Sequence, residues 1–204
     1  EGGLLALTET PFSEPTGDAS PRAPPVSRAA STTETQYLRS APNLAAAAQN
    51  SAPSLTDQAL APVLAQALQI WAASGIDGSI SGRLANLKVR IADLPEGVLG
   101  ETDGDAITIA PNADGFGWFV DPTPGESSEF GITLDSSRLT ADAGSDAFGR
   151  VDLLTVLVHE IGHVVGLGHD SGLPVMGENL GRGERVSMQG AVLLTRADGS
   201  IAGA

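Results

Sequence analysis

The chain has 204 residues, a formal net charge of −14 and no cysteine. Its length favours a single domain, and its 41% hydrophobic content supports a core. The absence of cysteine excludes disulfides and cysteine metal ligands, and the acidic charge argues against nucleic acid and anionic membranes as partners. No apolar run reaches the roughly 18 residues that a membrane span needs. No signal peptide follows Glu1, so we expect a fragment or a processed form.

The first part of the chain, residues 1–53, is rich in Ser, Thr, Pro, Ala and Gly. Such a composition buries too little apolar surface to offset the entropy of ordering the chain. We therefore interpret residues 1–53 as a disordered linker or pro-segment. Residues 54–190 are then the folded domain, and residues 191–204 a C-terminal strand or tail.

The folded domain begins with a predicted helix over residues 54–75. Ser54 or Thr56 can cap its start, and Gly75 can end it. Pro62 either kinks this helix or marks its true start. Its apolar residues recur at helical spacing, at Leu60, Val63, Leu64, Ala67, Leu68 and Trp71.

The central segment contains short runs with strand character. Residues 87–94 alternate apolar and polar side chains, which is typical of a strand. Further strand candidates, separated by turn-forming sequences, are residues 97–100, 106–110, 117–121 and 130–134. Helices and strands of this kind predict an α+β fold.

The most informative pattern is VHEIGHVVGLGHD, residues 158–170, which contains all 3 histidines of the chain. On a predicted helix over residues 153–165, His159 and His163 are four residues apart and project from the same face. Two imidazoles at this spacing can bind one zinc ion. The alternative, histidines buried by accident in a core, would not explain the third histidine of the pattern.

Glu160 follows the first histidine and is expected to lie beside the metal as general base for a zinc-bound water. Gly166 can end the helix, because glycine adopts the left-handed conformation without a Cβ penalty. The chain can then turn back and supply His169 as third ligand. One coordination position stays open in such a site, as in catalytic rather than structural zinc sites.

These residues match HExxHxxGxxH at every fixed position, and Met176 lies seven residues beyond His169. The stretch resembles the metzincin metallopeptidases, and the short gap to Met176 resembles their matrixin branch. Asp170 is more like the adamalysin branch, because matrixins usually carry serine there. Residues 115–180 also resemble matrixin-like domains of large bacterial surface and repeat proteins.

The resemblance implies a metzincin-like zincin. Its twisted mixed sheet would have a backing helix, a central zinc-binding helix and a short C-terminal subdomain after the methionine turn. Met176 would form an apolar floor beneath the zinc. Residues 117–121 would supply the edge strand of the cleft, with Trp118 and Phe119 at its rim, unless one or both are core residues. The glycines of residues 177–190 disfavour the helix that matrixins place there.

The resemblance also implies a function, that of a zinc-dependent endopeptidase with one catalytic zinc. Its partner would be an extended protein or peptide substrate, and we expect a monomer that is secreted or at the cell surface. A calcium ion is a second expected cofactor, since the loop at Asp114 resembles a matrixin calcium loop and Asp121 lies nearby. Ordinary solvated acidic loops are the alternative to calcium.

Two other functions are compatible with the sequence. One is a zinc-binding adhesion or interaction module that keeps the fold with little turnover. The other is an enzyme that acts mainly on its own chain. Part of residues 1–53 is also a candidate to block the cleft, as in bacterial metzincins that use an aspartate for this purpose. Asp18 is the one aspartate in that segment, and a plain linker is the alternative.

Overall fold

A computed structural model describes residues 36–41, 52–75 and 79–188, and the fold is described for these residues. The helices are α1 (Asp57–Ala73), α2 (Ser79–Leu84) and α3 (Leu153–Val164), with 3-10 turns η1 (His169–Ser171) and η2 (Pro174–Met176). The strands are β1 (Gln36–Ser40), β2 (Lys88–Ile91), β3 (Val98–Asp103), β4 (Ala106–Ile109), β5 (Trp118–Phe119), β6 (Ile132–Thr133), β7 (Arg138–Thr140), β8 (Val151–Asp152), β9 (Asn179–Leu180) and β10 (Glu184–Val186). Helices packed on a mixed sheet confirm the expected α+β class.

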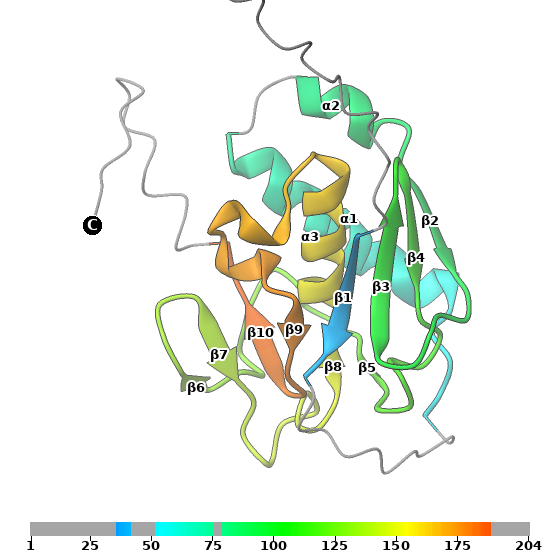
Figure 1. The fold of residues 1–204 in the computed structure, drawn as a ribbon. Helices are drawn as coiled ribbons and strands as arrows, with labels where there is room; N and C mark the ends of the chain where they lie inside the picture. Colours follow the sequence, from blue (N-terminus) through cyan, green and yellow to red (C-terminus); the bar gives the residue numbers. More distant parts are fainter. Residues whose placement is uncertain (1–35, 42–51, 76–78, 189–204) are drawn as a thin grey trace, which may run out of the picture. The chain divides into compact units, whose positions relative to one another are not determined.

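The largest sheet has the strand order β2-β4-β3-β1-β9. β2 is parallel to β4, whereas β3 is antiparallel to both of its neighbours, β4 and β1. β1 in turn lies parallel to β9. Figure 1 shows β1 between β3 and β9, although these three strands are far apart in the sequence.

Helix α1 lies behind α3 and confirms the predicted backing helix. The side chain of Thr56 caps its start by accepting a hydrogen bond from the Ala59 amide at 3.3 Å. Trp71 donates from its indole Nε1 to the Val158 carbonyl of α3 at 2.9 Å. The buried face of α1 consists of Leu60, Val63, Ala67 and Trp71, four of the residues in the predicted apolar pattern.

Helix α3 lies in the centre of the fold, between α1 and the sheet, and all twelve of its residues are buried. A helix that is apolar nearly all round can be stable only where it is covered on every side. The Asp152 carboxylate caps its start by accepting from the Thr155 amide at 3.2 Å and the Thr155 hydroxyl at 2.7 Å.

Strand β1 falls within residues 1–53, which the composition assigned to a linker or pro-segment. The difference arises because the main stabilising contacts of β1 are backbone hydrogen bonds and one buried side chain, Leu38, which composition does not reveal. The boundaries at residues 53 and 190 stay predictions. Asp18 and residues 191–204 lie outside the described residues.

The predicted edge strand and rim need correction. β5 pairs with β8 in a separate two-stranded sheet, and the strand that packs on α3 and pairs with β1 is β3, an inner strand of the five-stranded sheet. Trp118 is 6% exposed and Phe119 is 3% exposed, so both are core residues rather than rim residues. Trp118 also donates from its indole to the Ala110 carbonyl at 2.8 Å. The apolar run of residues 117–121 fits a buried strand as well as an edge, and its sequence cannot distinguish the two.

Candidate metal centre

Three histidines from two elements meet at one point of the fold. His159 and His163 project from α3, and His169 begins η1 after the chain turns at Gly166, whose φ is 97°. One ring nitrogen from each lies within 4.8 Å of the others. Within the described residues they form the one cluster of three or more histidine, aspartate or glutamate side chains that can share a metal ion.

The hydrogen bonds of these rings define which nitrogens face one another. The Nδ1 atoms of His159 and His163 each lie 2.8 Å from a backbone carbonyl, that of Val175 and that of Leu167 respectively. A carbonyl can only accept, so each Nδ1 carries the proton and each Nε2 of a neutral ring carries a lone pair. These two Nε2 atoms are 2.9 Å apart.

Two lone pairs at this distance repel each other unless a cation lies beside them. The Nε2 atom of His169 is also buried and has no hydrogen-bond partner, so this nitrogen is available as a third ligand. Burial lowers the pKa of His159 to about 3 and also lowers the pKa of His163, so both rings are neutral at neutral pH. Three imidazoles whose ring nitrogens face one another, two of them held neutral by burial, fit zinc.

Glu160 lies on the side of α3 that faces the sheet and is fully buried. Its Oε2 accepts from the Thr102 hydroxyl of β3 at 2.7 Å, and its Oε1 accepts from the Leu38 amide of β1 at 3.2 Å. Burial raises the pKa of Glu160 to about 8. A Cβ on Gly100 would lie 2.8 Å from Oε1, so glycine at this position leaves room for the carboxylate.

Thr102, Gly100 and Leu38 were not identified from the sequence. No motif marks them, because their role depends on strand pairing that brings β1 and β3 against α3. A glycine and a threonine two residues apart in a short strand have no distinctive pattern of their own. The hydrogen bonds to Glu160 were therefore visible only in the folded chain.

Met176 packs directly beneath the zinc helix and is fully buried. Gly162 lies between the two helical histidines in the sequence, and a Cβ there would collide with the Met176 sulfur. The same Cβ would lie 3.2 Å from the Trp71 ring. Met176 therefore packs against α3 at Gly162, and its role as an apolar floor beneath the zinc stays a prediction. Asp170 follows His169 in η1 and is exposed.

Comparison with known protein families matches residues 38–189, well over half of the chain, to the matrixin family. This chain belongs to the matrixin family. Matrixins are zinc metallopeptidases, and the histidine cluster supports a catalytic zinc in this one. No curated protein and no solved structure matches this matrixin.

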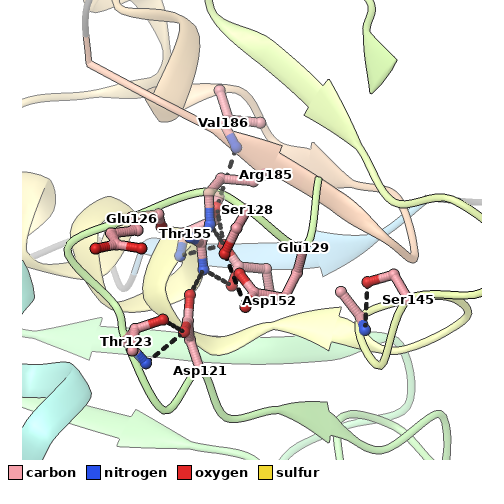
Figure 2. A network of polar contacts seen from close by, with 11 residues as sticks. Asp121, Thr123, Glu126, Ser128, Glu129, Ser145, Asp152, Thr155, Arg185 and Val186 are labelled. Carbon is pink, nitrogen blue, oxygen red and sulfur yellow. Dashed lines mark hydrogen bonds and ion pairs between the residues drawn. The ribbon is translucent and has the colours of Figure 1, made fainter. Parts of the chain in front are cut away.

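The two aspartates proposed as calcium ligands have different surroundings. Figure 2 shows Asp121 in a buried network, where its Oδ2 lies 2.8 Å from Arg185 Nη2 and its Oδ1 accepts from the Thr123 amide at 2.7 Å. Asp114 belongs to a loop in which its φ is 57°. Calcium binding by this matrixin remains a prediction without support from these contacts.

In the described part of this matrixin, none of the helices has the length and apolar character needed to cross a bilayer.

Proposed function

We propose that this matrixin is an endopeptidase that uses zinc to hydrolyse bonds within extended peptides. The observation that carries the proposal is the convergence of three histidine rings, one with an unpaired buried Nε2 atom, beside the helix that also carries Glu160. A secreted or cell-surface location is part of the proposal and rests on the family alone.

His159, His163 and His169 would hold the zinc ion. When bound, zinc supplies a Lewis acid that polarises the scissile carbonyl and increases the acidity of a water molecule. The carbonyls of Val175 and Leu167 keep the two helical imidazoles in the tautomer that presents Nε2. These contacts support a preformed ligand set.

Glu160 would take a proton from the attacking water and deliver it to the amide nitrogen of the leaving peptide. Its raised pKa, about 8, lies in the range in which one group can both accept and donate a proton near neutral pH. The hydrogen bond from Thr102 fixes the direction of the carboxylate. An extended substrate is favoured because the backbone groups of β3 can pair with an extended peptide. In this structure β1 pairs with β3 in that way.

The proposal is tested with the full chain, zinc and a denatured protein, with and without a chelator. We expect cleavage within the substrate that the chelator stops and that Glu160→Ala abolishes while zinc stays bound. Glu96→Ala, which removes an exposed carboxylate, is the matched control and should cleave like the parent. A Glu160→Ala variant as active as the parent would refute the mechanism. Zinc binding without any cleavage would instead favour the adhesion or interaction module.

A further inference from the structure

We propose that β1 is a built-in substrate strand and that the first bond hydrolysed at this centre is the chain's own Tyr37–Leu38 bond. This inference rests on the proposed function and names the first substrate of the same site.

Strand β1 is held by both of its neighbours in the way that an added peptide would be. On the β3 side, Tyr37 pairs with Glu101 and Leu38 with Gly100 in an antiparallel ladder. On the β9 side, the Arg39 amide donates to the Glu178 carbonyl at 3.0 Å. The Ala41 amide then donates to the Leu180 carbonyl at 3.0 Å. Backbone pairing of this kind binds an extended chain independently of its sequence.

The register of β1 places one peptide bond next to Glu160, the candidate general acid. The Leu38 amide nitrogen lies 3.2 Å from Glu160 Oε1, the distance over which a proton can be passed to a leaving nitrogen. Two residues earlier, Gln36 lines two surface hollows, one that reaches His169 and one that reaches His163. The chain therefore passes from the histidines to Glu160 across the Tyr37–Leu38 bond.

The side chain of Leu38 locks this register. Leu38 is 1% exposed and belongs to the main core, whereas Tyr37 is 39% exposed. Because side chains alternate along a strand, a shift by one residue would place Tyr37 or Arg39 in the core and Leu38 in solvent. Because burial of the leucine side chain favours this register over the shifted ones, the Leu38 amide stays opposite Glu160.

The reaction is a hydrolysis with water as co-reactant. The oxygen of water forms a bond to the Tyr37 carbonyl carbon, and the bond from that carbon to the Leu38 nitrogen breaks. Glu160 transfers the proton that it takes from water to the Leu38 nitrogen. The products are a carboxylate at Tyr37 and a new amino terminus at Leu38.

The cleavage test uses the full chain, purified without metal and then supplied with zinc, beside a denatured protein in a separate tube. Mass spectrometry and N-terminal sequencing should find a product that begins at Leu38 and that is absent from Glu160→Ala. If the denatured protein is digested while the chain's own Tyr37–Leu38 bond stays intact, this inference is overturned and the proposed function still stands. If neither the denatured protein nor the Tyr37–Leu38 bond is cleaved, both this inference and the proposed function are overturned.

A second test needs no catalysis and follows amide hydrogen exchange in the metal-free chain. The amides of Leu38, Arg39 and Ala41 should exchange at least about ten-fold more slowly than in a free peptide. Leu38→Asp puts a charge in the core and should abolish this protection, whereas Arg39→Asp, the same new side chain on the exposed face, should keep it. Unprotected β1 amides in the parent chain would overturn the inference, whatever the variants do.

Discussion

The hydroxyl of Thr102 and the carboxylate of Glu160 form the contact on which the proposed proton transfer depends most directly. The donor comes from β3 and the acceptor from α3, and both side chains are buried. A buried carboxylate without its donor loses part of the stabilisation of its charged form, and it is also freer to rotate. Thr102 therefore acts as a positioning residue rather than as a reacting group.

We expect Thr102→Val, which keeps the shape and removes the hydroxyl, to lower kcat about ten-fold, because one buried hydrogen bond contributes about 1–2 kcal/mol. KM and zinc content should stay near those of the parent. Thr102→Ser restores the hydroxyl and should recover most of the activity. Steady-state kinetics on a peptide decides the matter, and equal losses in the valine and serine variants would show that packing, not the hydrogen bond, is responsible.

Gly162 is a second residue whose role can be read from the packing around it. Alanine is normally about 1 kcal/mol better than glycine inside a helix. At this position, however, the new Cβ would collide with the Met176 sulfur and crowd Trp71. Gly144 offers a control, because a Cβ there meets no atom within 4 Å.

We expect Gly162→Ala to destabilise the metal-free chain by about 1–3 kcal/mol, the usual cost of overpacking a core. Gly144→Ala should change the free energy of unfolding by less than about 0.5 kcal/mol. Urea unfolding followed by circular dichroism measures both. A Gly162→Ala variant more stable than the parent would mean that Met176 moves aside without cost.

At the scale of elements, a buried arginine of β10 joins this strand to the start of α3, beside a hydrogen bond from the Val186 amide to the Thr155 hydroxyl. Arg185 lies 2.8 Å from Asp152, which caps α3, and 2.8 Å from Asp121, as Figure 2 shows. It also donates from Nη1 to the Glu126 carbonyl at 2.6 Å. The two carboxylates share a single counter-charge, so its removal would leave both of them buried and unpaired.

We expect Arg185→Met to lower the free energy of unfolding by about 3–5 kcal/mol, because it leaves uncompensated buried charge. The comparison is Arg138→Met, which breaks the partly exposed pair with Glu184 at 3.4 Å. That pair should be worth less than about 1 kcal/mol. Urea unfolding of the two metal-free variants measures the difference, and similar losses in both would contradict the importance assigned to Arg185.

The two long helices were predictable from the sequence because their information is local. Apolar spacing defined α1 and α3, and Thr56 caps α1 as expected. The pairing of β1 with β3 was not predictable, since it is made by backbone groups that every sequence carries. Arg185 was missed for a related reason, because its partners lie 33 and 64 residues away in the chain.

At the scale of the whole molecule, the metal site joins α3 to the segment that follows it. His169 and the Val175 carbonyl come from beyond the helix, so a shared ion would tie this segment to the core. The Nε2 lone pairs of His159 and His163 face each other at 2.9 Å and repel. Bound zinc should relieve this repulsion in the native state, and the unfolded chain cannot gather the three ligands as well.

We therefore expect zinc to stabilise the fold by mass action. At a zinc concentration about 100 times the dissociation constant, the gain is about 2.7 kcal/mol, which for a domain of this size raises Tm by roughly 5–10 °C. Magnesium at the same concentration should have little effect, because imidazole nitrogen is a poor ligand for it. Glu160→Ala, thermally unfolded with and without zinc, measures this shift without the complication of self-cleavage. An equal rise in Tm with magnesium, or no rise with zinc, would mean that the three imidazoles do not act as one ligand set. Either result would also contradict the proposed catalytic zinc.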